Sequence, residues 1–402
     1  MRFSKSLFVA FAGLGLFACS NEDVTNGLND NGESKSIVIK LDGLDNGGRA
    51  IGAPTTESDK KTTTMSDVAI LLSDGTKILG HQKLDATSDA TEWNQLKGVN
   101  GYIMHEVNNH VREVHVIGNY SKESTVAAAV NGIQDGTTTL QSIKDIVIKA
   151  AQQQTFDEVT LYGSDVALTS DGTDETNPPH DGTSSKMLLA EVTVNHLVSR
   201  IEIGNIQCTD LGTMYKQIDL KYIGLLNYYN QTTLAGTGTG TIPMTLDNVL
   251  EPTTANANPG EGKFSWSNTN TDAAYKWAWD AITGASINSS TTQYNPSNEG
   301  SGDGKFVYQF IPTQVGSKNF QVKLYVDAKE NTSAAAPSSL NTVTANFTGD
   351  TDFAYEPGKI YKLDLIFSEN NIGPWNPDEV ICVKVKVTVA DWTIKTLTPT
   401  FE

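Results

Sequence analysis

The feature that most restricts the fold of this chain is a pattern of apolar residues at every second position, which recurs along its length. In such a run one face of an extended strand is apolar and the other polar, as in a β-strand that covers a core. Turn-forming Gly, Asn, Asp and Thr residues separate the runs. The pattern predicts an all-β fold (minor α). The predicted strands are 37–41, 68–72, 114–117, 159–162, 188–194, 199–203, 217–226, 305–311, 319–326, 342–347, 359–367 and 380–389.

One segment has a helical pattern instead. Six apolar residues between positions 139 and 153 would share one face of a helix: Leu140, Ile143, Ile146, Val147, Ala150 and Ala151. An apolar stripe of this kind is typical of a helix that packs on a core. We expect one amphipathic helix here, the minor helical part of the fold.

The length of the chain predicts two domains. Removal of an N-terminal signal at residues 1–18 would leave 384 of the 402 residues, which is more than one hydrophobic core usually holds. Residues 170–185 lack core-forming side chains and indicate a loop, and residues 191–203 are suited to an extended crossing segment. We place the boundary near residue 195, with domains at 50–195 and 196–368.

The N-terminus has the layout of an export signal. Arg2 and Lys5 precede an apolar run that is too short to span a bilayer. The run ends in Leu-Phe-Ala, and Cys19 follows. This ending resembles the bacterial lipobox, in which the cysteine is lipidated and becomes the first residue. The acidic stretch at 20–23 looks like the surface-export signal of Bacteroidetes lipoproteins. The alternative is an ordinary signal peptide followed by an incidental cysteine.

The charge of the chain excludes one class of partner. The formal net charge is −18, and no cluster of Lys and Arg is present. Because binding to phosphate groups needs a basic surface, nucleic acid is excluded as a partner. With Cys19 lipidated, two cysteines remain, Cys208 and Cys382. They could pair in an oxidising compartment, but two cysteines define no disulfide framework, and we expect two buried free thiols.

No motif for catalysis or metal binding stands out. His105 and His110 are five residues apart, and on a helix such residues diverge by about 140°, so they cannot share a zinc ion as in zinc proteases. The chain has no nucleophile elbow, Walker loop or dinucleotide fingerprint. We therefore expect no enzyme activity, no cofactor and no metal site.

The first predicted strand is followed by a candidate cleavage site. This strand would present three apolar residues on one face: Ile37, Ile39 and Leu41. The polar, glycine-rich stretch at 45–50 comes next and contains Arg49 followed by Ala50. Since exposed stretches of small and polar residues are preferred sites of proteolysis, we expect cleavage between Arg49 and Ala50.

The C-terminus carries the longest alternating strand of the chain. Its apolar face consists of Ile381, Val383, Val385, Val387 and Val389. Residues 368–377 precede it and contain Gly373, Pro374 and Pro377, which predicts a hinge. A long apolar-faced strand promotes aggregation unless it has a dedicated partner. We therefore interpret residues 369–402 as a hinge and a donor strand, the alternative being an ordinary strand of the second domain.

The sequence resembles the fimbrillins of Bacteroidia, the subunits of type V pili. The resemblance covers most of the mature chain in layout, and its motifs are loose except at the two ends. It depends on the cysteine ending of the signal, on Arg49 after a first strand, on residues 114–119 and 198–203, and on residues 380–392.

The resemblance implies a fold and a mechanism. Each of the two domains would be a transthyretin-like β-sandwich. The lipidated precursor would reach the outer membrane, where an arginine-specific protease cuts after Arg49 and releases residues 19–49 with the lipid and the first strand. The C-terminal strand of another subunit would then fill the vacated groove, so the partners are identical or related fimbrial subunits. The mature protein would be part of an extracellular fimbrium that supports adhesion.

Three functions compete at this point. The first is a polymerising stalk pilin, and the second is an accessory, anchor or tip subunit of a fimbria. An anchor should keep its lipid and lack a donor tail, whereas this chain has both Arg49 and the tail. The third is a surface glycan-binding lipoprotein that uses Trp277 and Trp279, which would share one face of a strand and could stack on sugar rings. Aromatic packing over a sheet is the alternative role of these two residues.

Overall fold

The structure is a computed structural model. It describes residues 35–42, 63, 65–98, 100–154, 159–175, 185–226, 229, 231–236, 279–282, 284–296, 306–311, 321–331, 339–346, 356–374 and 384–391. The chain divides into two compact units, Met1–Gly32 and Glu33–Glu402. All of the described residues belong to the second unit. The lipobox, Arg49 and Ala50 lie outside the described ranges.

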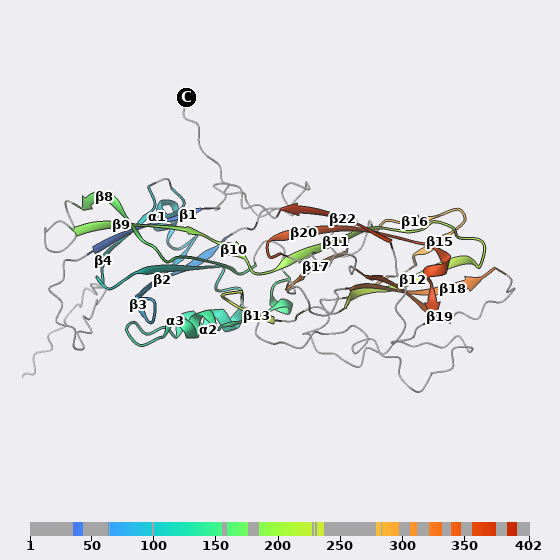
Figure 1. Cartoon of the computed structure of the whole chain (residues 1–402), viewed down its shortest axis with the longest axis horizontal. Coiled ribbons are helices and arrows are strands. Elements are labelled where there is room, and N and C mark those ends of the chain that lie inside the picture. Colours follow the sequence, from blue (N-terminus) through green and yellow to red (C-terminus); the bar gives the residue numbers. More distant parts are fainter. Residues whose placement is uncertain are drawn as a thin grey trace, which may run out of the picture. The chain divides into compact units, whose positions relative to one another are not determined.

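Two sheets are formed by the first half of the described chain (Figure 1). The four-stranded sheet has the order β4 (Tyr102–Val107), β1 (Lys35–Asp42), β9 (Ser185–Thr193) and β8 (Thr169–Glu175). The five-stranded sheet has the order β10 (Asn195–His196), β7 (Leu161–Asp165), β5 (Glu113–Gly118), β2 (Asp67–Ser73) and β3 (Ile78–Asp85). Strand β8 falls within the region 170–185 that the sequence indicated as a loop, so that interpretation was wrong for residues 170–175.

Two further sheets are formed by the second half. One has the order β16 (Gln293–Tyr294), β11 (Ser199–Cys208), β20 (Lys359–Phe367) and β22 (Lys384–Asp391), with β17 (Phe306–Phe310) also paired to β11. The other has the order β14 (Trp279–Ala281), β12 (Tyr215–Leu226), β18 (Gln321–Glu330), β19 (Ser339–Asn346) and β21 (Gly373–Pro374), with β15 (Ser286–Asn288) also paired to β12. Every predicted strand overlaps an observed one, and the predicted all-β class with few helices is confirmed.

The helices differ from the prediction. The described chain contains α1 (Ala90–Lys97), α2 (Ser124–Asn131) and α3 (Leu140–Lys144). The single helix expected at 139–153 ends after Lys144 and gives way to β6 (Val147–Lys149) and a 3-10 turn at Ala150–Gln152. Strand β6 pairs with β13 (Gln231–Thr233), and Ile148 is fully buried there. The β-branched run at 146–148 favours an extended backbone once a partner strand is present.

Three clusters of buried apolar residues hold the sheets together. One lies beneath β1 and includes Val194 and Val198, a second lies beneath helices α2 and α3, and a third includes Ile201 and Phe367. The chain passes from the first to the third cluster between Val198 and Ile201, close to the predicted domain boundary at residue 195. The residues from Glu33 onward nevertheless form one compact unit, so the division into tandem transthyretin-like domains stays a prediction.

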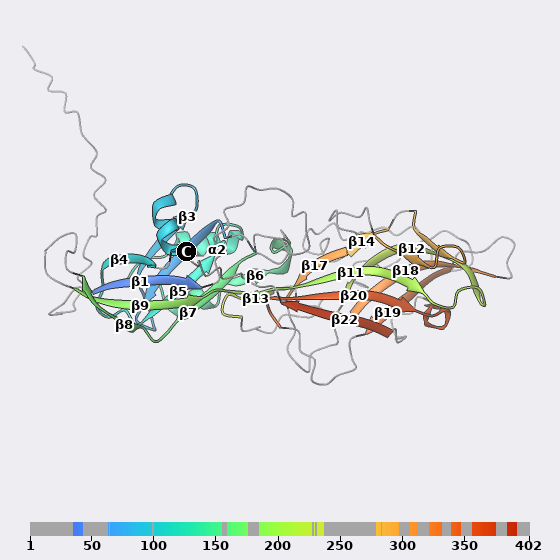
Figure 2. The same ribbon diagram turned by 90° about the horizontal axis from the view of Figure 1, so that it is seen from above.

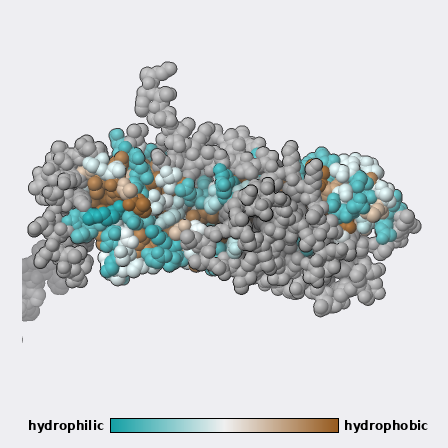
Figure 3. All heavy atoms as spheres, in the orientation of Figure 1, coloured by the Kyte–Doolittle hydropathy of each residue, from teal (hydrophilic) through white to brown (hydrophobic). Residues whose placement is uncertain are grey.

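The described surface is largely polar. Hydrophilic residues are spread among smaller apolar areas in Figure 3. Within the described ranges, the exposed large apolar side chains are Val166 and Met214. No helix in this part of the chain is long and apolar enough to cross a membrane.

Candidate assembly site

Strand β1, the strand that the fimbrillin resemblance implies is removed, lies between two other strands of its sheet (Figure 2). On one side it pairs antiparallel with β4, from Lys35 opposite Val107 to Ile39 opposite Tyr102, with one irregularity in register. On the other side it pairs parallel with β9 over its whole length, from Lys35 opposite Lys186 to Asp42 opposite Thr193. Removal of β1 would therefore leave two strands with unpaired backbone groups.

The three apolar residues predicted for β1 point into a core. Ile37 and Ile39 are fully buried, Leu41 is 8% exposed, and all three belong to the apolar cluster beneath β1. Burial of three such side chains stabilises a strand by about 1.5–3 kcal/mol each. A strand that replaces β1 must therefore be apolar at every second position.

The C-terminal strand β22 lies at an edge of its sheet rather than free of the fold. It pairs antiparallel with β20, from Lys359 opposite Asp391 to Ile366 opposite Lys384. The backbone of Val385, Val387 and Val389 lies in β22, whereas Ile381 and Val383 are outside the described residues. Since an edge strand has one neighbour, it can leave its sheet at the loss of a single ladder.

The first part of the predicted hinge is anchored by Glu369. Its carboxylate accepts hydrogen bonds from the backbone N–H groups of four consecutive residues, 212–215, and its own N–H donates to Asp210 at 2.7 Å. Glu369 is 2% exposed, and Ile372 packs into the third apolar cluster. The hinge predicted at 368–377 is thus wrong for residues 368–374, and any hinge begins after Pro374.

The environment of Glu369 stabilises its charged form. Burial opposes ionisation, but the hydrogen bonds from Met214, Gly212 and their neighbours outweigh it and hold the pKa of the carboxyl below its ordinary value. Sequence reasoning missed this contact because the partners lie about 155 positions away, as for Met214. The local signal, Ser368 followed three residues later by Asn371, indicates only the capping box that the structure contains.

We expect Glu369→Gln to lower the free energy of unfolding by about 2 kcal/mol, because the amide group turns one acceptor oxygen into a donor and removes the charge that strengthens the remaining hydrogen bonds. Urea unfolding followed by circular dichroism measures the change. The control is Glu330→Gln, which alters an exposed carboxylate at the end of β18. Equal stability of the two variants would contradict the role of Glu369 as an anchor.

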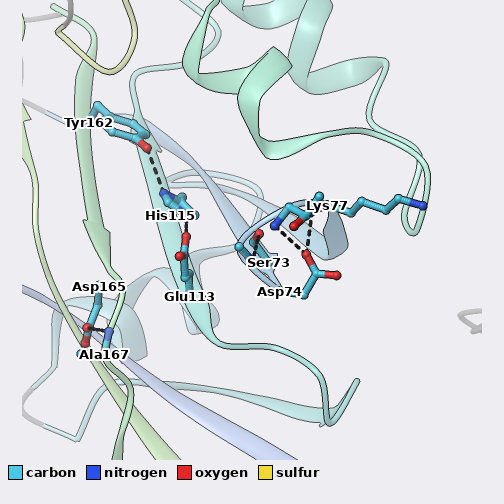
Figure 4. Close-up of polar contacts among 10 residues, drawn as sticks. Ser73, Asp74, Lys77, Glu113, His115, Tyr162, Asp165 and Ala167 are labelled. Carbon is cyan, nitrogen blue, oxygen red and sulfur yellow. Dashed lines mark hydrogen bonds and ion pairs between the residues drawn. The ribbon is translucent and has the colours of Figure 1, made fainter.

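Two polar clusters lie in the segments that carried the fimbrillin resemblance. In β5, fully buried His115 contacts the Tyr162 hydroxyl through Nδ1 and the Glu113 carboxylate through Nε2, each at 2.9 Å (Figure 4). In the crossing strand β11, the Arg200 guanidinium binds the Glu202 carboxylate at 2.8 Å. Burial lowers the pKa of His115 and, to about 10, that of Arg200. These groups are engaged with one another, as in structural polar networks.

His196 should make the stability of the protein depend on pH. Burial, with a smaller contribution from Arg200, lowers its pKa from 6.5 to about 3. Below pH 6.5 the unfolded chain binds a proton at this histidine, whereas the folded chain does not bind it until the pH approaches 3. The free energy of unfolding therefore decreases as the pH is lowered from 6.5 to 3. By pH 5 the loss from this group is about 2 kcal/mol.

The variant His196→Gln should lose that part of the pH dependence. Urea unfolding at pH 7 and pH 5 provides the measurement, and His81→Gln, at a partly exposed histidine, is the control. A parent chain and a His196→Gln variant with the same difference between the two pH values would contradict the prediction.

The remaining predicted residues are placed as follows. Cys208 is a buried free thiol whose pKa burial raises to about 11, as expected, and Cys382 lies outside the described residues. The backbone of Trp279 lies in β14, and Trp277 is outside the described part. Cys19, Arg49 and Ala50 are outside it as well. Within the described residues, no group of three or more His, Cys, Asp or Glu side chains is arranged to hold a metal ion.

Three solved structures similar to this chain come from Bacteroidia. A putative cell adhesion protein from Bacteroides eggerthii is 14% identical with a TM-score of 0.52, and the match covers 91% of this chain and 98% of that one. The chain shares the fold of this protein. A putative cell adhesion protein from Parabacteroides distasonis (12% identity, TM-score 0.49) and a fimbrilin from Porphyromonas gingivalis (9%, 0.47) each match 90% of this chain and 98% of their own length.

The similar solved structures thus include a protein named as a fimbrilin, the kind of protein that the sequence resembles. No protein-family model matches the sequence, and a comparison with curated proteins also gave no match.

Proposed function

We propose that the protein is a structural subunit of a type V fimbria, a stalk pilin that supports adhesion. It is exported as a lipoprotein on Cys19 and held at the outer membrane. An arginine-specific protease cuts it after Arg49, and the C-terminal strand of one subunit then replaces strand β1 of the next. An accessory, anchor or tip subunit is the second candidate, because it would share the fold and the export route.

The observation that supports this proposal most is the position of β1. It precedes the predicted cleavage point, and all the other described elements follow that point. A cut after Arg49 would therefore release one central strand and leave the covalent chain of the remaining sheets intact. The resulting groove has backbone groups on both sides and an apolar floor, which an added β-strand can satisfy.

The similar structures add a second support. The names of several include a fimbrial or adhesion role, and the Bacteroides eggerthii protein, called a putative cell adhesion protein, shares the fold. A fimbrial stalk also suits a chain with a net charge of −18, since a charged surface keeps a secreted protein soluble until assembly.

The experiment that tests the proposal compares the full-length chain with the variant Arg49→Ala. After treatment with an arginine-specific protease, the parent chain should lose residues up to Arg49 and form filaments visible by negative-stain electron microscopy. The variant should stay monomeric, because β1 continues to occupy its groove. Filaments formed equally by Arg49→Ala, or an N-terminus other than Ala50 in the filaments, would contradict the proposal.

A further inference from the structure

Strand β1 is buried on both faces over most of its length. Opposite the core face, Ser36 is fully buried, Val38 is 3% exposed, and only Lys40 is partly exposed. The backbone of Gly101 lies against this second face, so close that a Cβ atom there would be 2.8 Å from Val38 Cγ1. A replacement strand must therefore be small and uncharged at the positions of Ser36 and Val38, as well as apolar on the core face.

Strand β22 can be laid over β1 in the same direction or in the reverse direction. Both strands contain eight residues. In the same direction, with Val385 at the place of Ile37, Lys384 and Lys386 would take the places of Ser36 and Val38. A shift of two residues still brings Lys384 to Val38. Because a lysine enclosed without a partner costs several kcal/mol, these registers are disfavoured.

A shift of two further residues removes the charge but not the crowding. It would bring Cys382 to the place of Val38 and Val380 to the place of Ser36. The isopropyl group of Val380 would then have to fit a fully enclosed serine site, and overpacking of this kind is destabilising. This register would also use residues that precede β22.

The reverse direction avoids both problems. It matches all eight residues of β22 to all eight of β1, from Asp391 at Lys35 to Lys384 at Asp42. The core positions receive valines in place of larger apolar residues, and Lys386 takes the place of Lys40. Ala390 stands at Ser36 and Thr388, which has the shape of valine, stands at Val38. Each enclosed position thus receives an uncharged side chain that fits the space.

The hydrogen-bond ladders also favour the reverse direction. Strand β1 is parallel to β9 over eight residue pairs, and antiparallel pairing is slightly more stable per residue than parallel pairing. A reversed donor strand would make this long ladder antiparallel. It would also make the shorter ladder with β4, which has four residue pairs, parallel, so more pairs gain than lose. The donor would also exchange one neighbour, β20, for two neighbours, β4 and β9.

We infer that β22 of a second copy of this chain enters the groove of β1 in the reverse direction, with Val389, Val387 and Val385 at the places of Ile37, Ile39 and Leu41. The inference depends on the proposed function, because the groove opens only when β1 leaves. It specifies which residues of the two subunits become neighbours. Thr193 of β9, now opposite Asp42, lies opposite Lys384 of the incoming strand.

Disulfide cross-linking tests the register. Four full-length chains each carry Thr193→Cys and Cys382→Ala, together with one further cysteine at Lys384, Lys386, Thr388 or Ala390. The reverse register brings only residue 384 opposite residue 193, whereas the three registers in the same direction bring residue 390, 388 or 386 there. Cα atoms of directly paired residues are within the range that a disulfide spans. Thr193 is exposed, so the pair is accessible to a mild oxidant.

The chains are cleaved with an arginine-specific protease, allowed to assemble, oxidised and examined by non-reducing gel electrophoresis. We expect a covalent ladder of oligomers with Lys384→Cys and the loss of that ladder with the other three cysteines. A ladder with one of those three, in filaments of normal appearance, overturns the register and leaves the proposed function standing. Absence of filaments from the cleaved parent chain overturns both.

Discussion

A chain that ends at Pro374 should fold, be cleaved after Arg49 and fail to form filaments. It keeps Glu369, which binds four backbone N–H groups, and Ile372, which packs into the third apolar cluster. The truncation removes only the edge strand β22 from the described part of the fold. We therefore expect a cooperative thermal unfolding transition at a somewhat lower temperature, together with a complete loss of polymerisation, because the donor strand is missing.

The control for this truncation ends six residues earlier. From the sequence alone, a chain ending at Ser368 would be expected to fold equally well, since residues 369–374 belong to the predicted hinge. The structure contradicts this expectation. The shorter chain lacks Glu369, so the N–H groups of residues 212–215 lose the carboxylate that binds them, and hydrogen bonds to a charged group contribute about 1.5–3 kcal/mol each. Circular dichroism melts and negative-stain images of both chains provide the measurement. Filaments from the Pro374 chain, or its failure to unfold cooperatively, would contradict donation by β22.

Alternation of apolar residues predicted the strands well because most of them bury one face. In β1, Ile37, Ile39 and Leu41 were identified as the core face in this way, and the structure buries all three. The burial of Ser36 and Val38 could not be predicted, since the enclosing backbone of Gly101 is contributed by a segment about sixty positions away. The requirement on the second face of a donor strand is therefore visible only in the structure.

The wrong helix at 139–153 has a similar cause. Ile143, Ile146 and Val147 fit a helical stripe, but Ile146, Val147 and Ile148 are also a β-branched run. Local pattern does not decide between the two, and the decision comes from β13, whose Thr232 pairs with Ile148. Likewise, Glu369 is anchored by residues 212–215, which lie far from it in the sequence.

The substitution Val387→Asp should abolish filament formation while leaving the precursor folded. In the reverse register this residue takes the place of Ile39, which is fully buried at the centre of β1. A carboxylate without a partner in that position would cost several kcal/mol, a large part of the free energy that the incoming valines contribute at about 1.5–3 kcal/mol each. In the precursor, Val387 lies opposite Leu363, which belongs to the third apolar cluster, so the same change should lower the melting temperature of the uncleaved chain. It should not unfold the chain, because β22 is an edge strand with one neighbour.

The matched control is Lys384→Asp, which changes the charge of the same strand by one unit more but places the carboxylate where β1 itself has Asp42. It should polymerise almost normally after cleavage. Negative-stain microscopy and sedimentation of the cleaved proteins distinguish the two variants, and thermal unfolding of the uncleaved proteins verifies that both are folded. If both variants lost their filaments equally, the change in net charge would be the cause. If both kept their filaments, the valine face of β22 would have no part in assembly, and another surface would have to join the subunits.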